Sequence, residues 1–170
     1  MELNLKGRVA LITGGSQGIG YATAEELLKE GVAVAICARD AKRLAEAAEE
    51  LRDRTGERIE AIRADVMDPD QIEAFVGEAE RRLGSIDILV NNAANYRDGE
   101  LSQLPDEYWD HHITTKLKAY VRFVRLVVPG MKERGWGRII NLGGGAARHV
   151  MRNSQDLWIG VSRDLLITTL

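Results

Sequence analysis

The glycine-rich stretch at residues 13–20, TGGSQGIG, is the feature of this sequence that most constrains its fold. Strand-prone residues 9–13 lead into it, and an amphipathic helical pattern at residues 21–29 follows it. Glycines in this position permit a tight turn and a close approach of a ligand to the backbone. The N-terminus of the following helix offers unpaired N–H groups and the positive end of its dipole. The stretch therefore predicts a strand, a phosphate-binding turn and a helix.

The rest of the chain alternates between apolar runs, typical of buried strands, and amphipathic runs, typical of helices. Strands are expected at residues 32–38, 58–64, 86–90 and 137–142, and helices at 40–54, 68–83 and 105–134. We expect a bend in the last helix near Pro129 and, in the tail, a loop followed by a helix from about Leu157. This order predicts an α/β fold with a Rossmann-like, doubly wound parallel sheet of about five strands. One domain would cover residues 1–170, with a divergent tail at 146–170.

Charge and composition argue against several classes of partner. The formal net charge of -3 indicates no nucleic-acid or anionic-membrane partner. The longest apolar run, residues 32–38, is too short to span a bilayer, and the N-terminus shows no signal-peptide pattern. The single cysteine, Cys37, excludes an internal disulfide pair, which fits a reducing compartment. These features predict a cytoplasmic protein.

The end of the second predicted strand bears on cofactor choice. An NAD site is expected to carry an acidic residue there, about 20 residues past the glycine turn, to bind the adenosine ribose. This chain has Ala38 followed by Arg39. Alanine leaves room for a 2′-phosphate, and arginine can hold it with paired hydrogen bonds, so NADP is favoured over NAD. Asp40 suits a helix N-cap, and Gln17 adds no second charge.

At this point the chain resembles a known family, the short-chain dehydrogenases/reductases in their cofactor-first form. The resemblance is carried by the glycine-rich stretch, by Asp65-Val66 after the third strand, by NNAA at residues 91–94 and by the long helix with Trp109. It covers roughly Lys6 to Gly145. The family's last strands would be missing, so the resemblance predicts a C-terminally truncated member.

The resemblance implies where a nicotinamide dinucleotide binds. Asp65 would bond the adenine amino group beside the backbone of Val66, and Asn92 and Ala93 would lie along the ribose. Asn91 would mainly brace the sheet. The full set of expected cofactor-binding residues, including Arg39 from the residues themselves, is Gly14, Ser16, Gln17, Gly18, Ile19, Gly20, Arg39, Asp65, Val66, Asn92 and Ala93.

The resemblance also implies hydride transfer between NADP(H) and a carbonyl or alcohol carbon, by an asparagine, a serine, a tyrosine and a lysine. None of these four is found here. Lys116 occupies the asparagine position and Gly144 the serine position. No tyrosine follows Tyr120 and no lysine follows Lys132, so no Tyr-x-x-x-Lys pair exists. We therefore expect no intact catalytic set, and we expect Lys116 to be a solvated surface residue.

Adjacent histidines do not change this picture. His111 and His112 point about 100° apart on a helix, so no metal site is predicted. Trp109, Tyr120 and Phe123 recur at helical spacing and indicate packing.

Three functions remain open from the sequence. The first is an NADP-dependent oxidoreductase acting on a small-molecule carbonyl or alcohol. The second is a non-catalytic dinucleotide-binding pseudoenzyme, and the third is a truncated or frame-shifted fragment without activity. Because the absence of the family's later strands would leave one sheet edge uncovered, we also expect a homo-oligomer or self-association.

Overall fold

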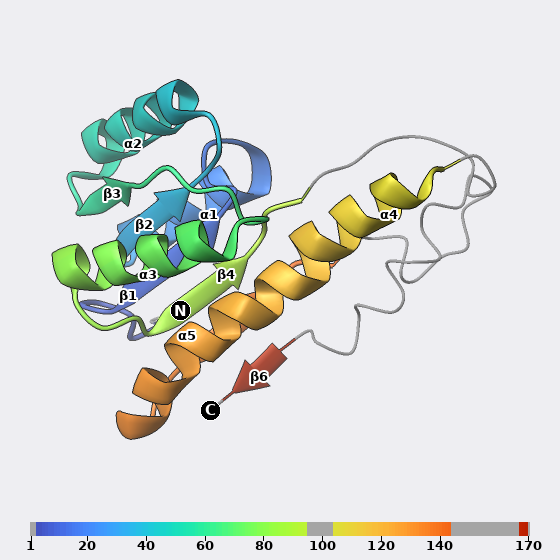
Figure 1. Cartoon of the computed structure of the whole chain (residues 1–170). Coiled ribbons are helices and arrows are strands. Elements are labelled where there is room, and N and C mark those ends of the chain that lie inside the picture. The colour runs from blue at the N-terminus through green and yellow to red at the C-terminus, as the bar shows by residue number, and fades with distance from the viewer. Residues whose placement is uncertain (1–2, 95–103, 144–166, 170) are drawn as a thin grey trace.

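The computed structural model describes residues 3–94, 104–143 and 167–169, and these residues form an α/β fold around one sheet (Figure 1). The strands lie in the order β3-β2-β1-β4-β5-β6. Their bounds are β1 Val9–Thr13, β2 Ala33–Cys37, β3 Ile59–Ala61, β4 Ile88–Asn91, β5 Arg138–Asn141 and β6 Ile167–Thr169. Strands β1 to β5 are parallel, and β6 is antiparallel to β5. The predicted Rossmann-like parallel sheet of five strands is confirmed.

Helices cover both faces of this sheet. Their bounds are α1 Gly18–Lys29, α2 Ala41–Thr55, α3 Pro69–Leu83, α4 Asp106–Ile113, the π-helical segment η2 Thr114–Lys118 and α5 Ala119–Glu133. Helices α3 and α5 pack on one face, as Figure 1 shows, and α1 and α2 pack on the other. Because both faces are covered, consecutive residues of β1 such as Ala10, Leu11 and Ile12 are all fully buried.

The predicted helix caps are present. Asp40 is the N-cap of α2, and its Oδ1 accepts a hydrogen bond of 3.1 Å from the main-chain N–H of Arg43. Asp68 caps α3 in the same way, with Pro69 at the first helical position. Gly56 ends α2 with a φ of 72°, a conformation that favours glycine.

The long helix is less regular than its sequence pattern indicates. Helix α4 passes into η2 and then into α5, which continues through Pro129 to Glu133. The departure from α-helical hydrogen bonding therefore lies at residues 114–118, ahead of the proline. Segments of this π-helical kind occur frequently at functional sites.

The end of the C-terminal tail, residues 167–169, differs from the sequence-based prediction. We expected a helix from about Leu157, but residues 167–169 form β6, which pairs with β5 through Ile140 and Ile167. Strand β6 therefore lies along the edge of β5 that we expected to be uncovered. Gly144 and the rest of the tail to residue 166 lie outside the described residues.

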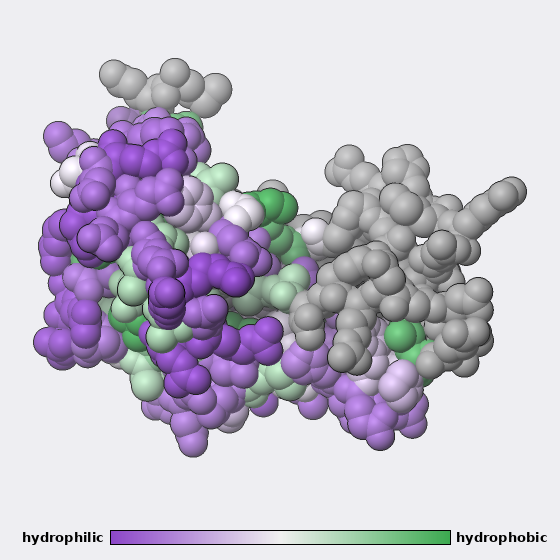
Figure 2. Space-filling model, turned by 90° about the horizontal axis from the view of Figure 1, so that it is seen from above, coloured by the Kyte–Doolittle hydropathy of each residue, from purple (hydrophilic) through white to green (hydrophobic). Residues whose placement is uncertain are grey.

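The described surface is largely hydrophilic in the view of Figure 2, with small hydrophobic areas between the polar ones. Its exposed large hydrophobic side chains are Leu3, Ile19, Leu126 and Ile140. None of the described helices is long and apolar enough to cross a membrane. Self-association remains a prediction.

Candidate functional site

The carboxyl ends of β1 and β4 are joined by a network centred on Thr13, the last residue of β1. Thr13 Oγ1 accepts hydrogen bonds of 2.9 Å from the main-chain N–H groups of Asn92 and Ala93. In return, Asn92 Nδ2 donates to the carbonyl oxygens of Thr13 and Gly14, at 2.9 and 3.0 Å. These bonds fix the glycine-rich turn against the residues that follow β4. Thr13 was not predicted as a site residue, although it opens the motif.

Two glycines of the turn are required by close packing. Gly14 has a φ of 68°, and its N–H donates to the carbonyl oxygen of Cys37 at the end of β2, at 2.9 Å. A Cβ on Gly20 would collide with the carbonyl oxygen of Gly14 and would lie 2.5 Å from Asn92 Nδ2. The turn is therefore held between the ends of β2 and β4, and a side chain at Gly20 has no room.

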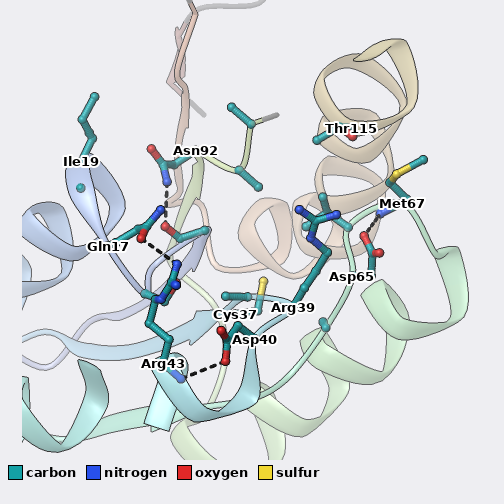
Figure 3. A pocket seen from close by; sticks show the side chains of 18 of the residues that line it. Gln17, Ile19, Cys37, Arg39, Asp40, Arg43, Asp65, Met67, Asn92 and Thr115 are labelled. Carbon is teal, nitrogen blue, oxygen red and sulfur yellow. Dashed lines mark hydrogen bonds between the residues drawn. The ribbon is translucent and has the colours of Figure 1, made fainter. Parts of the chain in front are cut away.

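A cavity of about 490 Å³ opens at this edge of the sheet (Figure 3). Ten of the eleven predicted cofactor residues line it; Gly20 does not line it and lies buried below the turn. The lining residues are Gly14, Ser16, Gln17, Gly18, Ile19, Cys37, Ala38, Arg39, Asp40, Arg43, Ala64, Asp65, Val66, Met67, Asn92, Ala93, Ala94, His111 and Thr115. The volume is within the range of cavities that hold small-molecule ligands.

Two arginines, not one, border the cavity beyond β2. Arg39 follows β2, and Arg43 lies one turn later on α2. Arg43 Nη1 donates to Gln17 Oε1 at 3.0 Å, which links α2 to the glycine-rich turn (Figure 3). Sequence reasoning missed Arg43, because its bond to Gln17 joins two segments that are 26 residues apart.

The carboxylate of Asp40, between these arginines in the sequence, caps helix α2. Asp40 lines the cavity, and the N–H of Arg43 holds the pKa of its carboxyl below the ordinary value. The charge of Asp40 therefore faces the N-terminus of α2, where it stabilises the helix dipole. The predicted N-cap role of Asp40 is confirmed.

The loop after β3 forms the far end of the cavity and is held at several points. Asp65 Oδ1 accepts a hydrogen bond of 3.0 Å from the N–H of Met67, and the N–H of Asp65 donates to Gln71 Oε1 at 3.0 Å. Arg122 reaches from α5 to donate to the carbonyl oxygen of Met67 at 3.1 Å. The loop is thus fixed to α3 and α5 before any ligand binds.

Cys37 also lines the cavity, at the end of β2. Its side chain is fully buried, and burial raises the pKa of the thiol to about 12. The thiol is therefore neutral at physiological pH and acts as a small apolar group.

Lys116 is not the solvated surface residue that we expected. Its side chain is partly buried, and its Nζ donates to the carbonyl oxygen of Leu142 at 3.2 Å, just past β5. Tyr120 donates to the same carbonyl oxygen at 3.1 Å. Burial lowers the pKa of Lys116 and raises the pKa of Tyr120. The prediction was wrong because η2 lies against the end of β5, a contact that the polar helix pattern does not reveal.

The remaining predicted positions divide between the cavity and the sheet. Asn91 is buried, and its Nδ2 donates to Asn141 Oδ1 at 2.8 Å, which joins β4 to β5. His111 lines the cavity, whereas His112 is buried. Within the described ranges no group of three or more His, Cys, Asp or Glu side chains could hold a metal ion.

The packing prediction for the long helix holds for its second half. Phe123 is fully buried, and its ring meets that of Phe75 of α3 edge to face, with centroids 6.1 Å apart. Tyr120 is also buried, whereas Trp109 is half-buried beside the ring of Tyr108.

Comparison with known proteins agrees with this geometry. The model of the short chain dehydrogenase family matches residues 8–155. The 3-oxoacyl-[acyl-carrier-protein] reductase FabG of Vibrio harveyi is 39% identical over 141 residues, which are 83% of this chain and 56% of that protein. This chain spans about half the length of the curated relatives that it matches.

Solved structures show the same likeness. The L-sorbose reductase of Gluconobacter frateurii, in complex with NADPH and L-sorbose, is similar with a TM-score of 0.89 and 36% identity, over 98% of this chain and 62% of that one. An alcohol dehydrogenase of Thermococcus sibiricus, in complex with 5-hydroxy-NADP, is similar with a TM-score of 0.85 and 28% identity, over 93% of this chain and 68% of that one. The chain therefore belongs to the short-chain dehydrogenase family.

Proposed function

We propose that this chain binds NADP(H) along the carboxyl edge of its sheet, as the cofactor-binding part of an oxidoreductase. When bound, the cofactor would give a hydride to a carbonyl carbon in its reduced form, or accept one from an alcohol carbon in its oxidised form. Family membership supports the reaction class, and the NADPH and 5-hydroxy-NADP complexes of two similar structures support the cofactor. A carbonyl or alcohol substrate is part of the same proposal.

The observation that carries the choice of NADP is the pair of arginines beside Ala38. Arg39 and Arg43 both border the cavity where β2 ends, and Ala38 leaves that end without the carboxylate that an NAD ribose requires. Two guanidinium groups suit the doubly charged 2′-phosphate, because arginine binds phosphate through paired, charge-assisted hydrogen bonds.

The rest of the cavity suits the remainder of an adenine dinucleotide. Gly14 and residues 16–19 would hold the pyrophosphate at the N-terminus of α1, where the helix dipole favours an anion. Asp65 and Val66 would contact the adenine base, and Asn92 and Ala93 the ribose. Each of these residues lines the cavity, and the Thr13 network and the Arg122 bond hold their loops in place.

The test is a titration of the chain with NADPH and with NADH, followed by the fluorescence of the reduced nicotinamide. We expect Arg39→Ala to weaken NADPH binding by at least about tenfold and Arg43→Ala by about threefold or more, since each removes a charge-assisted bond. Binding of NADH should change little in either variant.

The matched control is Lys42→Ala, which removes a positive charge from the same turn of α2 at a residue that does not line the cavity. Lys42→Ala should leave NADPH binding within about twofold of the unchanged chain. A chain that binds NADPH and NADH equally well, with no loss in Arg39→Ala, would contradict the choice of NADP.

A second function is a dinucleotide-binding protein without catalysis. It is favoured by Lys116, which stands where the family has its asparagine and is bonded to a carbonyl oxygen of the chain itself. The absence of any tyrosine after Tyr120 in the sequence points the same way. Carbonyl-dependent oxidation of NADPH separates the two: a rate above buffer supports the oxidoreductase, and binding without a rate supports the pseudoenzyme.

If the chain binds no dinucleotide, the third candidate, a fragment without activity, gains support. Reading the coding DNA beyond residue 170 in all three frames tests it directly. A continuing frame that encodes a Tyr-x-x-x-Lys pair and further strands would identify a truncated or frame-shifted oxidoreductase. DNA without such a frame would count against that explanation.

A further inference from the structure

A hydrogen bond joins two walls of the cavity on its open side. Gln17, the N-cap residue of α1, follows β1, and Arg43 lies in the first turn of α2. Arg43 Nη1 donates to Gln17 Oε1 at 3.0 Å, as Figure 3 shows. Both side chains are exposed and both line the cavity, so the bond lies between the cavity and the solvent. This pair is called the Gln17–Arg43 bridge below.

The fold makes little other use of these two side chains. Gln17 makes no capping hydrogen bond with its side chain, although it is the N-cap residue of α1. Arg43 serves the cap of α2 through its main-chain N–H alone. Within the described residues, Gln17 Oε1 is the one hydrogen-bond acceptor of its guanidinium group. A single exposed bond between long side chains is weak enough to open and close in solution.

The bridge lies across the path of the dinucleotide that we propose. That ligand would run from Asp65 and Val66, beyond β3, to the glycine-rich turn beyond β1. In the sheet β2 lies between β3 and β1, so the ligand passes the end of β2, where α2 begins. A guanidinium group has five N–H donors. Arg43 can therefore hold Gln17 through Nη1 and a phosphate group through its other donors at the same time.

We propose that the Gln17–Arg43 bridge is a strap, which opens to admit the dinucleotide and closes again over the bound ligand. The inference rests on the proposed function and adds to it a control of the binding rates. One net hydrogen bond favours the closed strap over the open one about fivefold. Because the ligand enters and leaves only while the strap is open, both rate constants are lowered by about that factor. The dissociation constant, which is their ratio, changes little.

Stopped-flow fluorescence of the reduced nicotinamide measures both rate constants. NADH is the first probe, because it lacks the 2′-phosphate and so separates the strap from the phosphate contact of Arg43. Arg43→Met should raise the association and dissociation rate constants of NADH about fivefold each. The dissociation constant of NADH should stay within about twofold. Unchanged rate constants for NADH in Arg43→Met would overturn the strap.

The matched control is Arg54→Met, which removes another arginine bond between the same two helices. Arg54 Nη2 of α2 pairs with Glu25 Oε1 of α1 at 2.9 Å, and neither residue lines the cavity. Arg54→Met should leave both rate constants for NADH within about twofold of the unchanged chain. Equal acceleration in Arg43→Met and Arg54→Met would overturn the strap, because loosening the two helices would then explain both.

Gln17 provides the second test, with NADPH as the probe. Gln17→Met removes the acceptor and should raise both rate constants about fivefold, but neither of them in the Arg43→Met background, where the strap is already absent. An equal effect in both backgrounds, or a rise in the dissociation rate constant alone, would make Gln17 a direct ligand contact and overturn the strap. The proposed function would survive either result. It falls, and the strap with it, if the unchanged chain binds neither NADPH nor NADH.

Discussion

The carboxyl ends of β1 and β5 lie at the same edge of one sheet, yet they are built for different tasks. Beyond β1, the glycine-rich turn borders an open cavity, and its fixed bonds are made behind that cavity by Thr13 and Asn92. Beyond β5, the carbonyl oxygen of Leu142 is taken by two side chains of the long helix, Lys116 and Tyr120. The first end is prepared for a ligand, whereas the second is satisfied by the protein itself.

The difference indicates which end of the sheet would hold the dinucleotide that we propose. Most residues that the family resemblance assigns to the cofactor line the cavity at the β1 end. At the β5 end, Lys116, the residue that we predict at the family's asparagine position, uses its amine to bond the main chain. Changes at the β1 end should therefore harm both folding and dinucleotide binding. Changes at the β5 end should affect stability alone.

The largest loss of stability and of NADPH binding is expected from Gly20→Ala at the β1 end. The added Cβ would collide with the carbonyl oxygen of Gly14, so the turn or α1 must shift. We expect the free energy of unfolding to fall by about 3 kcal/mol and NADPH binding to be lost. Urea denaturation measures the first effect.

The control for Gly20→Ala is Gly77→Ala, in the middle of α3. A Cβ there meets nothing within 4 Å, so alanine should stabilise the helix by about 0.5–1 kcal/mol. If the two variants change the free energy of unfolding by the same amount, residue 20 does not need to be glycine for close packing.

A smaller loss of stability is expected from Thr13→Val. The buried hydroxyl oxygen of Thr13 accepts two main-chain N–H bonds, and valine would leave both groups unpaired. We expect a loss of about 2–3 kcal/mol in the free energy of unfolding, together with weaker NADPH binding. Thr13→Ser keeps the oxygen and should lose about 1 kcal/mol for the missing methyl group. Equal losses in the two variants would show that the hydroxyl network does not hold the turn.

The smallest loss of stability is expected from single substitutions at the β5 end. Tyr120→Phe and Lys116→Met each remove one of the two donors to the Leu142 carbonyl, which keeps the other. Each should lower the free energy of unfolding by about 1 kcal/mol, and the double variant by more than the sum, because the carbonyl is then left unpaired. NADPH affinity should not change. A loss of affinity in Lys116→Met would break the comparison, since it would place Lys116 in the binding site.

The sequence predicts the parts of this molecule that depend on local pattern. The buried run at residues 32–38 and the Asp68-Pro69 cap each form the expected element within a few residues. The cavity lining was largely predicted because those residues follow strands of a parallel sheet, and the ends of such strands share one edge.

The missed residues depend on contacts between distant segments. Arg43 donates to Gln17, 26 residues away, and Lys116 donates to the carbonyl oxygen of Leu142, also 26 residues away. Neither contact has a periodic signal in the sequence. Thr115 lines the cavity through a helix whose π-helical segment the apolar pattern does not predict.

Hydrogen exchange of the main-chain amides with and without NADPH tests the central claim most directly, because it reports on both ends of the sheet in one measurement. The account predicts that NADPH slows exchange within the segments 14–20, 38–43 and 64–67, which contain most of the residues that line the cavity, and leaves residues 138–142 unchanged. Slower exchange at 138–142 with no change in the glycine-rich turn would contradict it.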